Sequence, residues 1–203
     1  MGETTEIIIS TLAALLLLGA LIYWLWRTTP TRRREPLEPL DARGWLLVVD
    51  GSNVSYRENK ARLKHLEEVL DLLRHRFQGA DLLVYCDASL RHQFRGKERQ
   101  RFEALLAKDP TFRQAPKGRK ADDFILAHAA ENPRAIVVSH DRFSKGPELE
   151  MRLKVPLLRI SFHEDPPLLA EKILRFEDED DPERPSLYEL ETFLASHERG
   201  AAA

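Results

Sequence analysis

Five aspartates are placed where they can meet at one site of the folded chain. Asp50, Asp87 and Asp141 each follow a short apolar run, and Asp122 and Asp123 form a pair at the start of a helical pattern. Apolar runs bounded by turn residues predict buried strands of a parallel sheet, and ligands bind beyond the carboxyl ends of such strands. We therefore expect acids from distant parts of the sequence to converge at one edge of the sheet.

This acidic cluster predicts a metal site next to a basic surface. Packed carboxylates repel one another unless a hard cation neutralises them, and Mg²⁺ or Mn²⁺ takes oxygen ligands of this kind. Such a cation polarises a phosphoryl oxygen and lowers the pKa of water, which suits a phosphodiester substrate. Basic side chains can hold this polyanion by charge without reading its sequence. The candidates are Lys117, Arg119, Lys120, Arg91, Arg95 and Arg142.

The elements that must position these residues alternate between strands and helices. Strands are expected over 45–50, 81–87, 135–139 and 156–162, and an ambiguous edge strand over 111–116. Helices are expected over 57–77, 89–108 and 144–152, from the Asp122–Asp123 pair onward, and, less clearly, over 168–176 and 186–197. The alternation predicts an α/β fold with a central, mostly parallel sheet and right-handed crossovers.

Several of these features have structural alternatives. Asp50 can begin an Asx-turn, and the helix dipole by itself favours acids at a helix start. The basic residues of 91–101 can form a solvated helix face. Asp87 can join the site or cap the helix that follows it. His140 can serve as an acid-base group, although a histidine beside a strand end is more often a hydrogen-bonded neighbour.

Residues 7–26 predict a transmembrane helix. Only Ser10 and Thr11 are even mildly polar in this stretch, which is long enough to cross about 30 Å of hydrocarbon. Arginines follow at once, so the positive-inside rule predicts a single-pass membrane protein with its C-terminal domain in the cytoplasm. A cleaved signal peptide is the competing reading, but the preceding residues are acidic rather than basic.

Length and composition limit the domain organisation and the kinds of site that this chain can have. The 203 residues suffice for one domain with appendages. Residues 45–166 hold 22 Lys and Arg against 18 Asp and Glu, whereas 167–203 hold 4 against 10, so the core is mildly basic and the tail acidic. Cys86 is the only cysteine, which excludes an intrachain disulfide and a Cys-based zinc site. We expect an anchor over 1–27, a linker over 28–44, the main domain over 45–165 and a C-terminal helix and acidic tail over 166–203.

Three motifs together resemble the NYN nucleases of the PIN-like superfamily, and most closely the Regnase-type catalytic domain of CCCH zinc-finger ribonucleases. They are Val49–Val54, Lys120–Ile125 and Val137–Phe143. They occur in the right order with plausible spacing, within about residues 45–165. The resemblance implies a PIN-like, Rossmann-like three-layer fold and an endoribonuclease that depends on Mg²⁺ or Mn²⁺ and acts on single-stranded or looped RNA.

The resemblance also implies roles for individual residues. Asp50 corresponds to the central metal ligand, and Asn53 to the residue that orients it or the substrate. Asp122 and Asp123 correspond to the paired acids of the helix, and Asp141 to the strand-end acid. The implied metal ligands are Asp50, Asp123 and Asp141, with Asp122 and Asp87 as further candidates.

Two departures from the family pattern leave other functions open. Lys145 stands where Regnase-type domains have a further acid, with Glu148 as a potential substitute, and the CCCH zinc finger is absent. One alternative is therefore a catalytically weak or inactive RNA-binding module. A metal-dependent protein-interaction domain is disfavoured by Val54, and a phosphatase by Ser52, because each occupies a position that needs another residue. The sequence leaves open a homodimer and a protein partner for the acidic tail.

Overall fold

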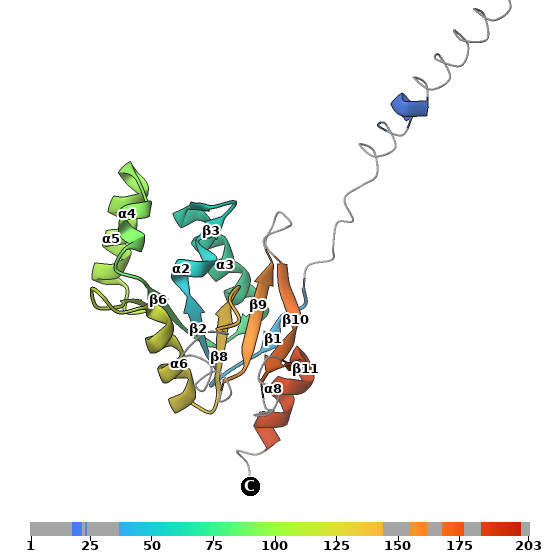
Figure 1. Ribbon diagram of the computed structural model, residues 1–203. Coiled ribbons are helices and arrows are strands. Elements are labelled where there is room, and N and C mark those ends of the chain that lie inside the picture. The colour runs from blue at the N-terminus through green and yellow to red at the C-terminus, as the bar shows by residue number, and fades with distance from the viewer. Residues whose placement is uncertain are drawn as a thin grey trace, which may run out of the picture. The chain divides into compact units, whose positions relative to one another are not determined.

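The second of two compact units of the chain contains the main sheet. The computed structural model describes residues 18–21, 23, 37–143, 155–161, 168–176 and 184–199. The two units comprise residues 1–37 and 38–203. In the second unit a seven-stranded sheet has the strand order β11-β10-β9-β8-β2-β6-β7 (Figure 1). The predicted α/β class is confirmed.

The sheet is mixed. Its strands are β2 (Leu46–Asp50), β6 (Asp81–Cys86), β7 (Phe112–Gln114), β8 (Ala135–Ser139), β9 (Leu157–Ser161), β10 (Leu168–Arg175) and β11 (Ser186–Glu189). The first five pair in parallel, whereas β10 is antiparallel to both of its neighbours. Because β2, β6 and β8 run in the same sense, Asp50, Asp87 and Asp141 lie at or just beyond one edge of the sheet.

Strand β2 lies between β6 and β8 and is buried on both faces. Val48 packs in one apolar cluster with Ile125 and Leu126, which come from a helix on that face. Leu47 and Val49 alternate with Val48, so they point to the opposite face, and they are fully buried as well. This double burial explains the unbroken apolar sequence before Asp50.

Helices follow most of the strands. They are α2 (Gly51–Val54), α3 (Leu63–Arg76), α4 (Leu90–Gln93), α5 (Gly96–Lys108), α6 (Ala121–Glu131) and α8 (Leu190–Arg199). Two short strand pairs complete the described part of the unit: β1 (Leu40–Asp41) with β5 (Phe77–Gln78), and the hairpin of β3 (Tyr56–Arg57) with β4 (Lys60–Ala61).

Local structure differs from the predictions in two places and agrees with them in two others. The helix predicted over 57–77 begins only at Leu63, because the β3–β4 hairpin precedes it. The helix predicted over 89–108 is broken into α4 and α5 at Phe94 and Arg95, whose backbones are extended. The predicted edge strand over 111–116 is present as β7, and the strand over 156–162 as β9.

Two of the C-terminal predictions are wrong in whole or in part. Within 168–176, predicted as a helix, Leu168–Arg175 form strand β10, and residues 186–189 form β11 before helix α8 begins. The register of β10 on β9 shifts between Leu169 and Ile173, so its apolar residues do not alternate as a regular strand requires. The helix predicted over 144–152 lies outside the described residues.

The predicted transmembrane helix, and the membrane localisation derived from it, are contradicted. Within the described residues, no helix combines the length and the apolar character that a membrane crossing needs. Of the predicted span over 7–26, the structure describes residues 18–21 and 23, and the rest lies outside the described residues.

Candidate active site

Asp50 is a buried carboxylate at the end of the central strand, with only 3% of its surface exposed. Its Oδ1 accepts a hydrogen bond from the backbone N–H of Asn53 at 2.9 Å and so caps the short helix α2. Its Oδ2 accepts one from the Ser139 hydroxyl at 3.0 Å. Gly51 permits this tight turn, because a Cβ there would lie 2.6 Å from the Cys86 sulfur. Both carboxylate oxygens therefore have fixed positions.

The surroundings of Asp50 disfavour its charge. Burial, with smaller contributions from the charges of Asp122 and Asp87, raises the pKa of Asp50 to about 7. The hydrogen bonds from Asn53 and Ser139 oppose this shift without cancelling it. The structure thus brings Asp122 and Asp87 close enough to Asp50 for each of their charges to repel that of Asp50.

Asp87 connects the end of β6 to the start of α6. Its Oδ1 accepts a hydrogen bond from the backbone N–H of Ala121 at 2.9 Å, and its own N–H donates to the Ser52 hydroxyl at 2.7 Å. The sequence left two roles open for Asp87, in the site or as the cap of the following helix. In the structure the side chain caps α6, a later helix, and its charge also acts on Asp50.

Asn53 and Ser139 join the end of β2 to the end of β8. The side-chain oxygen of Asn53 accepts a hydrogen bond from the backbone N–H of His140 at 2.8 Å. The Ser139 hydroxyl, which donates to Asp50, also accepts from the backbone N–H of Asp141 at 3.1 Å. Sequence reasoning missed Ser139. The signal in the sequence was a lone hydroxyl at the end of the apolar run over 135–139.

Asp141 and Asp123 have local partners. Oδ1 of Asp141 accepts hydrogen bonds from the backbone N–H groups of Arg142, at 2.6 Å, and Phe143, at 3.1 Å. These bonds close a turn in which Phe143 has a φ of 50°. Asp123 forms an ion pair with Arg119 at 3.4 Å. Of the two adjacent acids on α6, Asp122 is therefore the one whose charge acts on Asp50.

The carboxylates fit a hard cation in their chemistry. No three His, Cys, Asp or Glu side chains of the described residues converge closely enough to hold a metal ion by themselves. Mg²⁺ is commonly held by one or two carboxylates, with waters and substrate phosphates as its other ligands. Asp50 and Asp122, whose charge raises the pKa of Asp50, are the two carboxylates whose chemistry fits such a pair.

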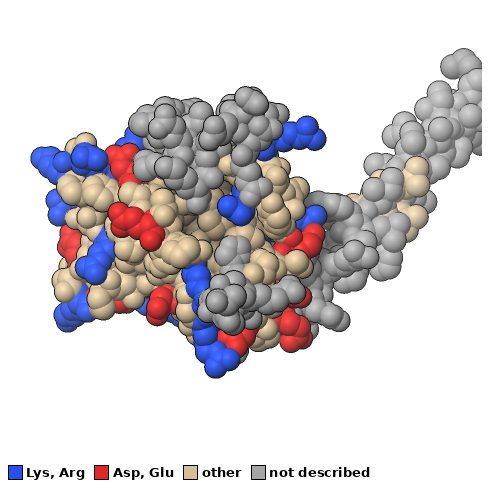
Figure 2. All heavy atoms as spheres, turned by 90° about the horizontal axis from the view of Figure 1, so that it is seen from below, with Lys and Arg blue, Asp and Glu red and all other residues tan. Residues whose placement is uncertain are grey.

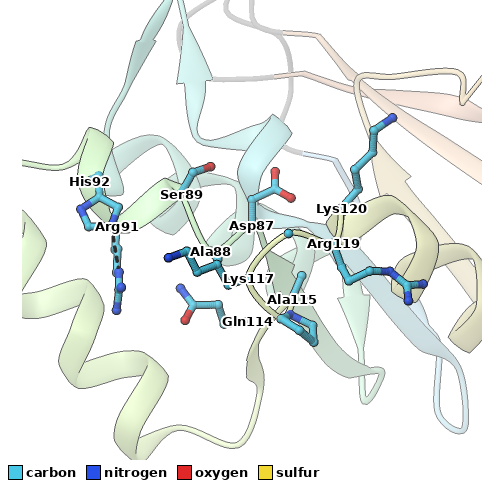
Figure 3. A pocket seen from close by; sticks show the side chains of 12 residues that line it. Asp87, Ala88, Ser89, Arg91, His92, Gln114, Ala115, Lys117, Arg119 and Lys120 are labelled. Carbon is cyan, nitrogen blue, oxygen red and sulfur yellow. Dashed lines mark hydrogen bonds between the residues drawn. The ribbon is translucent and has the colours of Figure 1, made fainter.

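A basic pocket of about 620 Å³ lies beside the carboxylates (Figure 3). Asp87, helix α4 and the loop from Gln114 to Lys120 line it. Lys117 extends from this loop toward α4, whereas Arg119 extends in the opposite direction, over α6 (Figure 3). The Arg119 guanidinium lies 5.6 Å from the centre of the Phe124 ring. The opposite end of the sheet differs, because there basic and acidic side chains are interspersed (Figure 2).

The six basic residues predicted to bind RNA do not all gather in one place. The pocket beside Asp87 is lined by Arg91, Lys117, Arg119 and Lys120. Arg95 lines a different cavity, together with residues of the β3–β4 hairpin. Arg142 lines a third cavity, beside His140 and Arg159.

The fold and the site define a class of protein. An α/β fold with parallel central strands, carboxylates at their carboxyl edge and a cationic pocket beside them is the arrangement expected of a PIN-like nuclease. This chain belongs to the family of the Zc3h12a-like ribonuclease NYN domain, whose family model matches residues 45–175. The resemblance to NYN nucleases inferred from three sequence motifs is therefore confirmed.

Solved structures of nucleases are also similar to this chain. Nuclear protein-only RNase P 2 (PRORP2) of Arabidopsis thaliana is 16% identical, with a TM-score of 0.48, over 84% of this chain and 37% of that one. The PIN domain endonuclease Utp24 is 17% identical, with a TM-score of 0.33, over 61% of this chain and 90% of that one. This chain thus spans little more than a third of the RNase P structure. No curated protein sequence matches it.

Proposed function

We propose that this protein is an endoribonuclease that depends on Mg²⁺ or Mn²⁺. The observation that carries the proposal is Asp50, a carboxylate that is buried, repelled by two further acids and placed beside a basic pocket. Such a carboxylate costs the fold stability at neutral pH, and a bound cation offsets that cost. The match to a ribonuclease family supports RNA as the substrate.

The acids of this edge have distinct proposed roles. Asp50 and Asp122 hold the cation, and Asp87, Asp123 and Asp141 are further candidate ligands. When bound, Mg²⁺ or Mn²⁺ supplies a Lewis acid for the phosphoryl group and lowers the pKa of water. Asn53 acts as a positioning residue, because its amide fixes the end of β8 against the turn that carries Asp50.

RNA is held by charge in the basic pocket. Arg91, Lys117 and Lys120 contact its phosphates, and Arg119 is partly occupied by its ion pair with Asp123. A cationic groove that follows the backbone suits a single strand or a loop and reads little sequence.

A non-catalytic RNA-binding domain is the second candidate. It is favoured by Lys145, which stands where Regnase-type domains have an acid, and by the lack of three converging ligands within the described residues. Both proposals require the basic pocket, but only the nuclease requires Asp50 as a carboxylate.

The substitution Asp50→Asn separates the two candidates. The full-length protein is incubated with end-labelled single-stranded RNA and Mn²⁺ or Mg²⁺, with EDTA as the metal-free control. We expect wild-type cleavage with metal, a loss of at least a hundredfold in Asp50→Asn, and similar RNA binding by both proteins. Asp81→Asn is the matched control, because Asp81 is an exposed acid at the other end of β6. An RNA-binding wild type that never cleaves with either metal would contradict the nuclease proposal and support the alternative.

A further inference from the structure

The β3–β4 hairpin is held rigidly next to the turn that carries Asp50. Its two-residue loop, Glu58 and Asn59, has φ values of 51° and 61°, as a tight type I′ turn requires. Ser55 is fully buried at its base. The Ser55 hydroxyl lies 2.7 Å from the Gly51 carbonyl oxygen, and the Ser55 carbonyl accepts a hydrogen bond from the Arg62 N–H at 3.0 Å. The hairpin therefore keeps a fixed position relative to the candidate cleavage site.

A cavity of about 350 Å³ lies between the hairpin and the α4–α5 segment. On one wall are Lys60 and Arg62, and on the other Arg95 and Glu98. Arg62 and Glu98 form an ion pair across it, at 3.7 Å. Within the part of the chain that the structure describes, no carboxylate pairs with Lys60 or Arg95, so two cations remain available to a polyanion.

Helix α4 separates this cavity from the basic pocket beside Asp87. Arg91 and His92 line the basic pocket, whereas Gln93 and Arg95, directly after them, line the second cavity. The hairpin and α4 both lie above the carboxyl end of β2 (Figure 1). A strand that leaves the basic pocket over α4 therefore meets further cations.

Tyr56 supplies an aromatic ring on β3, the strand that pairs with β4, whose residues line this second cavity. It pairs directly with Ala61, which lines the cavity, so both side chains are on the same face of the hairpin. The Tyr56 side chain is 39% exposed. No other aromatic ring in the described residues packs against it, whereas the similarly exposed Tyr188 packs on Phe193. Exposed rings beside cations are the usual platforms on which bases of single-stranded RNA stack.

We propose that the β3–β4 hairpin and α4 form a second RNA-contact site, in which Tyr56 stacks on a base and Lys60 and Arg95 contact phosphates. Single-stranded RNA occupies the basic pocket, crosses α4 and ends on the hairpin. The proposal rests on RNA being the ligand of the basic pocket, but it does not require cleavage. On this proposal, the hairpin supplies the additional affinity that long RNA has over short RNA.

The test uses full-length protein with Asp50→Asn, so that RNA stays intact, and labelled oligonucleotides of about 4 and about 12 nucleotides. We expect Tyr56→Ala to weaken binding of the longer RNA by about five- to a hundredfold and to leave the shorter one unchanged, because only the longer strand reaches the hairpin. Tyr56→Phe should restore binding. Tyr188→Ala is the matched control, since its ring is 37% exposed on β11.

A second measurement concerns charge. Lys60→Gln and Arg95→Gln should each lower the salt dependence of binding the longer RNA, by about one phosphate contact. Lys64→Gln, on α3, should not. Equal affinity for the longer RNA of the Asp50→Asn protein with and without Tyr56→Ala, with unchanged thermal unfolding, would overturn the second site. Cleavage is measured separately, in the protein that keeps Asp50. If that protein does not cleave RNA, the binding measurements still test the second site.

Discussion

At the scale of residues, Asp50 makes the stability of the protein depend on pH in an unusual direction. Its pKa is 3.8 as a free side chain and about 7 in the fold. Between these values the folded state binds the extra proton, so the free energy of unfolding falls as the pH rises from about 4 to about 7. The full loss for one such group is on the order of 4 kcal/mol.

This dependence can be measured by comparing the wild type with Asp50→Asn. In EDTA, we expect the variant to be the more stable protein at pH 8 and the difference to shrink toward pH 5. Mn²⁺ should raise the unfolding temperature of the wild type at pH 8, because a bound cation favours the ionised carboxylate, and should leave the variant unchanged. Identical pH dependence of both proteins in thermal unfolding would contradict the pKa that we assign to Asp50.

At the scale of elements, Asp87 positions α6 as well as contributing charge, and two substitutions separate these effects. Asp87→Ala removes the acceptor of the Ala121 N–H, so we expect a loss of about 1 kcal/mol in the free energy of unfolding. Asp87→Asn keeps an acceptor but removes a charge that raises the pKa of Asp50. Its stability should therefore stay near that of the wild type, and the pH at which Asp50 titrates should move down. Denaturant unfolding over a pH series measures both.

How far the site could be predicted depends on which elements carry it. Asp50 was predictable because apolar residues on both faces of β2 identify a buried parallel strand, and the ends of parallel strands share one edge. The hydrogen bond from Ser139 to Asp50 was not predictable, because it depends on the register of β8 on β2, which the sequence does not fix. The resemblance put Asp123 before Asp122 as a metal ligand, whereas in the structure it is the charge of Asp122 that acts on Asp50. The two acids are adjacent, and their directions depend on how α6 packs against the sheet, which the sequence does not fix.

The failures farther along the chain have tertiary causes. Residues 168–176 were mistaken for a helix because the register shift in β10 removes the alternation that identifies strands. No proline marks the break between α4 and α5 in the sequence. It matters for function, because it places Arg95 in a different cavity from Arg91.

At the scale of the whole molecule, the C-terminal segment completes the domain at the end opposite the candidate site. Strand β11 extends the main sheet, and α8 packs Phe193 against Trp45, with ring centres 5.7 Å apart. Arg76, only 2% exposed, donates to the carbonyl of Glu38 and pairs with Glu191 of α8 at 3.4 Å. The segment that precedes β2, helix α3 and helix α8 thus meet at one buried charge.

Phe193→Ala tests whether this junction stabilises the domain. Phe193 is only 4% exposed, so we expect the loss of its ring to lower the free energy of unfolding by about 3 kcal/mol in urea titration. Phe193→Leu fills most of the space and should cost clearly less. Phe193 packs on Trp45, which precedes the first residue of β2, whereas Asp50 is the last residue of that strand. Binding of RNA at the basic pocket should therefore not change in the folded variant. If Phe193→Ala were as stable as the wild type, α8 would be an appendage on a domain that is already complete without it.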